Sequence, residues 1–449
     1  MTEAVVAAAV GGGALARVYR NAGKLLGGKA VAGLIGLVYL SLGARTLGPT
    51  EFGLLVSINF YALLVGNFCV LQGWHTVVRY GSGDLIAEHP DDFIALWRYV
   101  ARIEIISGGV AIAIALALCE PVAHYLGWPD SVLPLALLYS LAIISNTQTT
   151  AAGVLNLFGR FDLLSLQQVS GPVARLIGAG LAWSLDAGLS GFLLAWLAGS
   201  IVEGLVQWAL GLRELHRRGL LSYRAAAPVS LKVRERHPGI LRFLLTNNLD
   251  LGLNDAAGRI TPLAVGALLN PAAVGLYHVA LRIGMVLQQP MLVIGRTVYP
   301  ELAVIAARGE FARLRRLVLR TGFSAMAGGV AVLALFVAIS PWLLRSIGGE
   351  GFDAAYPLLL LIGLARTLHL LGFPFGAALV ALGRPNTTLK INLVASLGLL
   401  PVLALLLQHY QLAGAGLHAL AYAVATVGAL VFALLRLPTT TTPIPTKVR

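Results

Sequence analysis

The sequence is poor in charge and in cysteine. Only 12% of its 449 residues are Asp, Glu, Lys or Arg, whereas 57% are hydrophobic and the mean hydropathy is +0.81. Soluble domains carry roughly 25% charged residues, so this composition excludes an ordinary soluble protein and predicts an integral membrane protein. The two cysteines, Cys69 and Cys119, lie within or at the end of apolar runs, which excludes a disulfide framework and a cysteine metal site.

Catalytic motifs are also missing. The sequence has no phosphate-binding glycine loop, no Ser/His/Asp arrangement in a motif context and no Cys/His metal spacing. We therefore predict that the chain is not an enzyme, needs no cofactor and no metal, and does not hydrolyse ATP.

Long apolar stretches dominate what is present. Twelve of them can cross about 30 Å of hydrocarbon as helices: 25–46, 52–74, 100–119, 132–157, 166–186, 188–211, 241–268, 272–297, 322–343, 354–381, 389–408 and 412–435. If the amino terminus is inside, 26 of the 33 Lys and Arg residues fall in cytoplasmic segments and only Arg45 and Arg345 fall outside. This asymmetry supports twelve spans with both termini cytoplasmic, and counts of eleven or thirteen stay open.

The spans divide into two halves. We predict the following organisation: a cytoplasmic N-terminal segment (1–24), a six-helix bundle (25–211), a basic cytoplasmic linker (212–240), a second six-helix bundle (241–435) and a disordered cytoplasmic tail (436–449). Contact with anionic membrane lipids explains the basic linker better than nucleic-acid binding does.

Two short phrases recur in the two halves. LGPTEFGLL at 47–55 matches LNPAAVGLY at 269–277, and FGRF at 158–161 matches LGRP at 382–385 at nearly the same offset. In the first phrase, we expect Gly48 and Asn270 to adopt the left-handed conformation that ends a helix, with the prolines after them starting the next one.

The repeats indicate a duplication. Because each half has an even number of spans, the copies share one orientation and are related by a pseudo-twofold axis along the membrane normal. This predicts an all-α transporter fold with a site near the membrane midplane and an alternating-access mechanism.

A few charges remain inside the predicted spans. The basic ones are Lys29, Arg175, Arg259, Arg282 and Arg366, and the acidic ones are Glu104, Glu203, Asp250 and Asp255. A charge at the bilayer centre costs roughly 2.5–3.5 kcal/mol, so such residues usually face a cavity or a partner. The slightly cationic interior suits an anionic substrate group, such as a phosphate or a carboxylate.

The seventh span is the most polar. Asn247, Asp250 and Asn254 share one face, and Asp255 and Arg259 belong to an adjacent stripe. We predict that this helix lines the cavity, with Asn247, Asn254 and Arg259 contacting substrate and with Asp250 and Asp255 coupling ions. The alternative is that Asp255 and Arg259, four residues apart, only neutralise each other.

Arg282, Gln289 and Arg366 complete the predicted substrate contacts. Arginine stays charged and can bind phosphate oxygens bidentately. For Arg282 and Arg366, a bond to a carbonyl of a neighbouring helix is the alternative. His278 and His369, which lie one turn from these arginines, could relay protons or be structural.

Four motifs in order resemble a known family. They are GARTLGPTEFGLL, LNPAAVGLYHVALRI, GRTVYPELA and ALVALGRPNTTLKINLV, and they are similar to Wzx-type polysaccharide flippases of the multidrug/oligosaccharidyl-lipid/polysaccharide exporter superfamily. The resemblance implies a V-shaped pair of six-helix bundles whose cationic lumen, here Arg259, Arg282 and Arg366, receives the anionic head group. Its substrate would be an undecaprenyl-pyrophosphate-linked oligosaccharide that passes from the inner to the outer leaflet of a bacterial plasma membrane.

The same resemblance implies a polymerase and chain-length proteins of a polysaccharide pathway as partners. The sequence departs from the family at Thr261, where relatives often have an acid. Ion coupling is therefore in doubt, or it has moved to Asp250 or Asp255.

Other functions stay open. A drug or cation antiporter of the same superfamily would be expected to have a more acidic lumen. A membrane-embedded polysaccharide polymerase needs a sizeable outer loop, and no predicted outer loop exceeds about a dozen residues. A non-transporting scaffold would not explain charges in the middle of the membrane.

Overall fold

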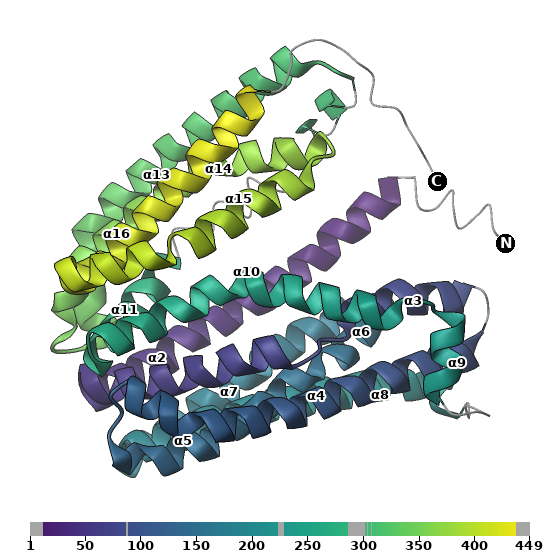
Figure 1. The fold of residues 1–449 in the computed structure, drawn as a ribbon, viewed down its shortest axis with the longest axis horizontal. Coiled ribbons are helices and arrows are strands. Elements are labelled where there is room, and N and C mark those ends of the chain that lie inside the picture. Colours follow the sequence, from purple (N-terminus) through teal and green to yellow (C-terminus); the bar gives the residue numbers. More distant parts are fainter. Residues whose placement is uncertain are drawn as a thin grey trace. The chain divides into compact units, whose positions relative to one another are not determined.

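The computed structural model describes residues 12–86, 89–222, 229–285, 301–302, 304–306 and 308–436, and all the regular secondary structure in this part of the chain is helical (Figure 1). Seven helical stretches in this part are long and apolar enough to cross a membrane. The prediction of an all-helical membrane protein is therefore confirmed.

The helices follow the apolar stretches of the sequence. Up to the middle of the chain they are α2 (Gly12–Cys69), α3 (Trp74–Ile86), α4 (Pro90–Tyr125), α5 (Leu133–Tyr139), α6 (Thr149–Leu157), α7 (Phe161–Ser184), α8 (Gly188–Arg217) and α9 (Val229–Arg236), with short 3-10 turns η1 (Asp130–Val132), η2 (Ser140–Gln148) and η3 (Leu220–Ser222). The remainder are α10 (Ile240–Leu268), α11 (Pro271–Gly284), α13 (Phe311–Gly348), η5 (Phe352–Ala355), α14 (Tyr356–Ala381), α15 (Pro385–Gly398) and α16 (Leu400–Leu435).

Two of these elements are pairs of helices that meet at a kink. In α2 the break is at Gly48, with φ 68°, and Pro49 follows it. In α16 it is at Gln411, with φ 53°. Both breaks fall between consecutive predicted spans. The predicted span 389–408 is itself divided between α15 and the start of α16.

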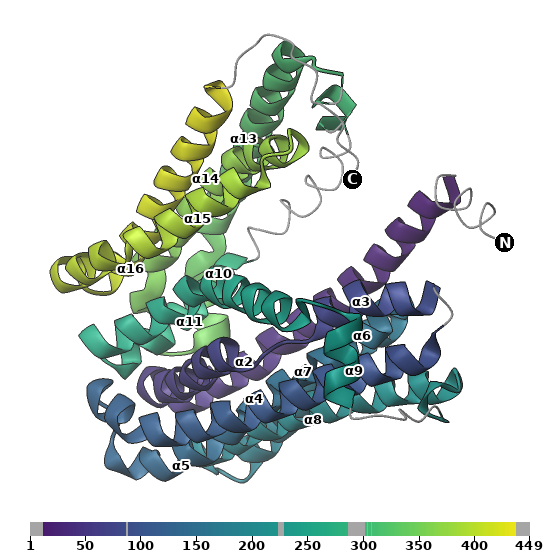
Figure 2. The ribbon, with the colours of Figure 1, turned by 45° about the vertical axis from the view of Figure 1, so that its right-hand side comes forward.

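The chain forms two compact units. The first unit comprises Met1–Leu47 and Ile58–Arg259, and the second comprises Gly48–Ser57 and Ile260–Arg449. In the first, α7 and α8 pack along each other; in the second, α14 packs against both α13 and α16 (Figure 2). The division falls within α10 because Ile240 and Leu244 are buried in an apolar cluster of the first unit.

Part of the predicted linker is helical. α8 continues to Arg217, with Leu215 fully buried near its end, and α9 occupies Val229–Arg236. At the other end of the chain, α2 begins at Gly12, inside the predicted N-terminal segment. The predicted tail lies outside the described residues from 437 onward.

The repeated phrase behaves differently in its two copies. Gly48 has the expected positive φ, but Asn270 is extended, with φ −171°. The prediction of a left-handed Asn270 was wrong because its side chain takes another role. Its Oδ1 accepts the N–H of Ala273 at 2.9 Å and caps the start of α11.

The second repeat, by contrast, is the same in both copies. Gly159 and Gly383 have φ values of 67° and 73°. The N–H of Arg160 donates to the carbonyl of Leu155 at 2.8 Å, and the N–H of Arg384 donates to that of Leu379 at 2.9 Å. Both are Schellman helix ends, in which a residue without Cβ adopts the left-handed conformation.

The two copies of the first phrase, which share the pattern LxPxxxGL at 47–54 and 269–276, pack against each other within the second unit. A Cβ on Gly53 would lie 2.6 Å from the carbonyl carbon of Pro271, and one on Gly275 would lie 2.5 Å from the carbonyl oxygen of Pro49. The contact is reciprocal, as a local twofold relation between the copies requires. It depends on glycine at both positions.

Candidate functional site

A break in the second predicted span is held by a side chain of α10. The backbone is not helical between Cys69 and Trp74. Asn248 binds both sides of Gln72: its Oδ1 accepts the N–H at 2.6 Å and its Nδ2 donates to the carbonyl at 3.1 Å. Backbone groups that leave a helix in an apolar setting must be satisfied by protein or water, and Asn248 satisfies two of them here.

Side chains of two further helices accept hydrogen bonds from the backbone of the same break. The N–H of Leu71 donates to Oγ of Ser107 on α4 at 2.9 Å, and the N–H of Gly73 donates to Oγ1 of Thr149 on α6 at 2.8 Å. Side chains from α4, α6 and α10 therefore replace the missing helical bonds.

Glu104 on α4, one of the four acids inside the predicted spans, caps a helix. It is fully buried, and its carboxylate accepts the N–H groups of Thr149 and Thr150 at 2.9 and 2.8 Å and the hydroxyl of Thr149. These residues begin α6, where N–H groups have no partner in the helix and favour a negative charge. The carboxyl group of Glu104 therefore stabilises the start of α6.

The first unit encloses a polar cavity of about 250 Å³ between η2, α7, α8 and the second half of α2. Arg175 and Glu203 lie in its wall with N···O 3.7 Å, and Nη2 of Arg175 donates to Oγ of Ser200 at 3.0 Å. The Tyr139 hydroxyl, also in the wall, donates to Oδ1 of Asn59 at 2.8 Å. Two charges that the sequence marked separately are thus paired.

The cavity network continues on both sides of this pair. Glu203 accepts hydrogen bonds from Gln148 and Gln167, and Tyr39 binds Arg175. A cavity of this volume is smaller than the roughly 300–1,000 Å³ of ordinary ligand pockets, so it suits water or a small ion. Sequence reasoning missed the pairing, although Arg175 and Glu203 occupy consecutive spans and have opposite charges.

The predicted residues of the seventh span lie on α10. Asn247 and Arg259 are half-buried, and Arg259 already takes part in an interaction within the molecule. The side chains of Asp250, Asn254 and Asp255 lie outside the described part of the structure. Their roles in substrate binding and ion coupling stay predictions.

In the second unit, Arg366 lies close to two tyrosines. It is half-buried on α14 and interacts electrostatically with Tyr277 of α11 and Tyr422 of α16. The ring of His369 stacks on Tyr422 at 5.6 Å, and its Nδ1 lies 2.9 Å from the carbonyl oxygen of Ala365. The three helices thus place one guanidinium among hydroxyl groups, without a carboxylate partner in the described chain.

Arg282 is half-buried on α11, and its charge acts on half-buried His278 one turn earlier. Neither Arg282 nor Arg366 donates a hydrogen bond to any residue that the structure describes. Gln289, the other predicted contact of this region, lies outside the described residues.

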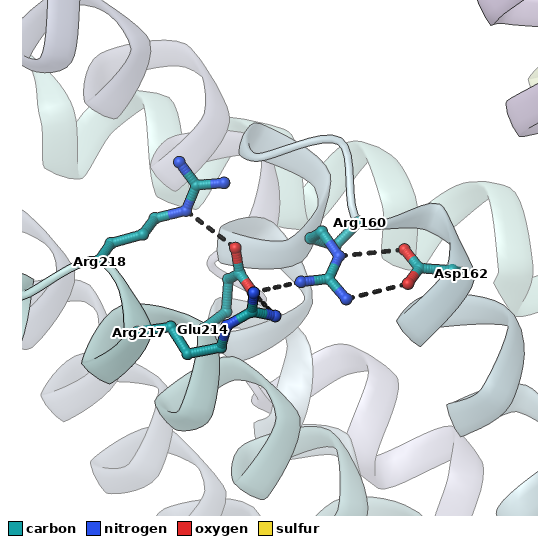
Figure 3. Close-up of polar contacts among 5 residues, drawn as sticks. All are labelled: Arg160, Asp162, Glu214, Arg217 and Arg218. Carbon is teal, nitrogen blue, oxygen red and sulfur yellow. Dashed lines mark hydrogen bonds and ion pairs between the residues drawn. The ribbon is translucent and has the colours of Figure 1, made fainter.

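A separate charge cluster joins the ends of three helices on the side predicted to be cytoplasmic (Figure 3). Arg160, from the FGRF motif, binds Glu214 at 2.6 Å and Asp162 at 2.9 Å, and Arg218 binds Glu214 at 2.8 Å. The hydrogen bond from Arg160 lowers the pKa of the Asp162 carboxyl. This cluster ties the turn between α6 and α7 to α8.

The described residues contain no group of three or more His, Cys, Asp or Glu side chains that could hold a metal ion. Besides the Arg160 cluster, the polar features described above are the break after Cys69, the cavity of the first unit and the arginines of the second unit.

Comparisons with known proteins agree with this architecture. The profile of the family described as "Polysaccharide biosynthesis protein" matches residues 18–305. Inner membrane protein YghQ of Escherichia coli (strain K12) is 31% identical over 351 residues, which cover 77% of this chain and 97% of that protein.

Solved structures share the fold at low sequence identity. The lipid II flippase MurJ, in an inward closed conformation, has a TM-score of 0.70 at 14% identity, covering 92% of this chain and 87% of that chain. An inward-facing multidrug resistance MATE family transporter of the MOP superfamily has a TM-score of 0.67 at 16% identity, covering 90% and 92%. The fold is thus that of the MOP superfamily, and by its sequence the chain belongs to the polysaccharide biosynthesis protein family.

Proposed function

We propose that this protein is a flippase that moves an undecaprenyl-pyrophosphate-linked oligosaccharide from the inner to the outer leaflet of a bacterial plasma membrane. It would work by alternating access and serve surface or exopolysaccharide assembly. The observation that carries the proposal is the pair of half-buried arginines, Arg282 and Arg366, which have no carboxylate partner among the described residues of a chain from this family. An anionic head group would supply the missing partner.

The proposed topology has twelve spans in two six-helix bundles. Helical segments of the described chain overlap the predicted stretches, and the kinks at Gly48 in α2 and Gln411 in α16 fall where the prediction places a boundary between spans. The superfamily fold and the matching Schellman ends at Gly159 and Gly383 support this organisation.

The proposed substrate contacts are Arg259, Arg282 and Arg366, together with Asn247, Asn254 and Gln289. Guanidinium groups suit a pyrophosphate because they bind its oxygens bidentately and remain charged in a poorly hydrated site. For ion coupling, we propose Asp250 and Asp255.

The relative YghQ is named as an inner membrane protein, and we propose the same location for this chain, with both termini in the cytoplasm. Membrane lipids surround it. The polymerase and chain-length proteins of a polysaccharide pathway are its proposed partners.

Transport in proteoliposomes tests the function. Purified protein should move a fluorescent lipid-linked oligosaccharide to the opposite leaflet, and Arg282→Ala and Arg366→Ala should each slow this by about 10- to 100-fold. That range follows from the roughly 1.5–3 kcal/mol of a hydrogen bond to a charged group. The control is Arg345→Ala, because Arg345 is exposed and pairs with Asp353 at 3.1 Å.

Two results would overturn the proposal. One is wild-type protein that moves no lipid-linked sugar while it polymerises or cleaves it, as the polymerase alternative requires. The other is export of cationic drugs without movement of the lipid-linked sugar. The second outcome would favour the antiporter alternative, which has support from the structural similarity to a MATE family transporter.

A further inference from the structure

A second anion site is suggested by a basic pocket in the second unit, at the beginning of α13. The pocket has a volume of about 670 Å³. Four arginines line it, together with one acid and three apolar residues: Arg308, Arg313, Arg316, Arg320, Glu301, Val304, Ile305 and Leu317. None of these residues belongs to the proposed transport site.

The arginines are held by the fold. Arg313, Arg316 and Arg320 are three and four residues apart, so they share one face of α13. Arg308 follows a helical turn whose residues Ile305 and Ala306 are buried in the core of the second unit. Arg308 thus brings the fourth guanidinium to the same pocket from outside α13.

Among the described residues, few acids offset the charge of these arginines. Arg313 forms an exposed pair with Glu310 at 3.1 Å, and Arg316 donates to the carbonyl of Ala312 in its own helix. Arg308 and Arg320 form no ion pair with any residue in the described ranges. Guanidinium groups that share a pocket repel each other, so an anion bound among them would be stabilised.

The adjoining helix surface places this pocket at the level of lipid head groups. At 1.5 Å per residue, the 38 residues of α13 extend about 57 Å, well beyond a hydrocarbon core of about 30 Å. Its apolar part begins directly after Arg320. The arginines therefore lie where the hydrocarbon ends.

An exposed apolar stripe leads from the membrane to the arginines. Arg316, Arg320, Phe323 and Val330 follow each other at helical spacing along one side of α13, and Phe323 and Val330 are 55% and 52% exposed. A lipid chain lying on this stripe would bring its phosphate to Arg316 and Arg320. This continuity favours a lipid over a free phosphate ion.

We propose that the pocket binds the head group of a lipid that carries two phosphate groups. One phosphate can be held bidentately by Arg316 and Arg320, and the pocket leaves Arg308 and Arg313 for a second. Basic pockets of this kind between membrane helices on the cytoplasmic side suit lipid head groups with several negative charges. Both a polyprenyl diphosphate and a bisphosphate phospholipid present this chemistry.

Lipid binding to the purified full-length protein tests the site, for example by titration monitored with native mass spectrometry. The probes are undecaprenyl diphosphate, cardiolipin, phosphatidylglycerol and inorganic pyrophosphate. The double variant Arg316→Gln/Arg320→Gln should bind both two-phosphate lipids about 30-fold more weakly, since each basic residue near a membrane surface contributes about 1 kcal/mol and 1.4 kcal/mol is tenfold. Arg345→Gln, at the opposite end of α13, should bind like wild type.

The outcomes separate the sources of the phosphate. Tighter binding of undecaprenyl diphosphate assigns the pocket to a pyrophosphate carrier lipid, and tighter binding of cardiolipin assigns it to a bilayer lipid; both support the site. Unchanged affinity in the double variant would refute it. So would phosphatidylglycerol or inorganic pyrophosphate binding as tightly as the two-phosphate lipids.

A milder variant guards against misfolding. Arg308 is exposed and outside α13, so Arg308→Gln should leave the unfolding midpoint unchanged while it weakens binding about fivefold. Unchanged binding in this variant counts against the proposal. Binding is measured without transport, so loss of the proposed flippase function would leave this inference standing.

Discussion

The crossing of the two LxPxxxGL copies is open to a direct test by Gly53→Ala and Gly275→Ala. A Cβ on Gly275 would lie 2.5 Å from the carbonyl oxygen of Pro49, and Cβ contacts below 3.0 Å essentially never occur. The helices would therefore have to separate by at least about 0.5 Å. The atoms in the way are backbone atoms, so no side-chain rotation relieves the clash.

Overpacking of this kind costs about 1–3 kcal/mol. Gly53→Ala should cost the larger part of that range, because its Cβ would approach Pro271 more closely than that of Gly275 approaches Pro49. The double variant should cost less than the sum of the two, since a single separation of the helices relieves both clashes.

Gly33→Ala is the matched control for this experiment. Gly33 lies within α2, and a Cβ there would have nothing within 4 Å. Alanine is the better helix former by about 1 kcal/mol, so this variant should unfold at or above the wild-type midpoint. The measurement is thermal unfolding of detergent-purified protein, followed by tryptophan fluorescence. A Gly53→Ala midpoint equal to wild type, or an equal loss in Gly33→Ala, would refute the close crossing.

Two further predictions concern charges in the first unit. Glu104→Ala leaves the N–H groups of Thr149 and Thr150 without acceptors, at about 1–3 kcal/mol each, so it should lower the free energy of unfolding by about 2–6 kcal/mol. The control is Glu120→Ala, on the exposed side of α4, which should change that free energy by no more than about 0.5 kcal/mol in the same unfolding assay. Equal midpoints for these variants would contradict the capping role. Since the pKa of Asp162 is lowered in the folded protein, its contribution is fully present above the unfolded value of about 4 and is lost as the pH falls through the folded pKa. The wild-type midpoint should therefore fall more steeply below pH 4 than that of Asp162→Asn, and parallel curves would argue against the interaction.

Much of the fold follows from local features of the sequence. Apolar length locates the helices, and Gly48, Gly159 and Gly383 mark helix ends because a positive φ suits a residue without Cβ. Asn270 was harder to predict, because asparagine suits both a left-handed helix end and a helix N-cap, and only the neighbouring backbone decides between them.

The site was less predictable, because it depends on contacts between helices distant in sequence. Nothing local to Gln72 shows that Asn248 binds its backbone from 176 residues away. Likewise, the sequence marks Glu104 as an unusual charge but does not show that it caps α6. Sequence identified which polar residues are costly in a membrane, while the fold determined which of them have partners.

The partners of these charges differ between the two units, and this difference makes a final prediction. In the first unit, Arg175 pairs with Glu203 and binds Ser200, so its charge is compensated by the protein. In the second, Arg366 interacts electrostatically with Tyr277 and Tyr422, and no carboxylate pairs with it among the described residues. Arg175→Ala should therefore lower the unfolding midpoint, because it leaves the half-buried carboxylate of Glu203 without its cation. Arg366→Ala should leave the midpoint near wild type while it weakens binding of a polyprenyl diphosphate by about tenfold or more. Equal losses of stability and of binding in Arg175→Ala and Arg366→Ala would refute the prediction that the arginine of the first unit is structural and that of the second unit binds substrate.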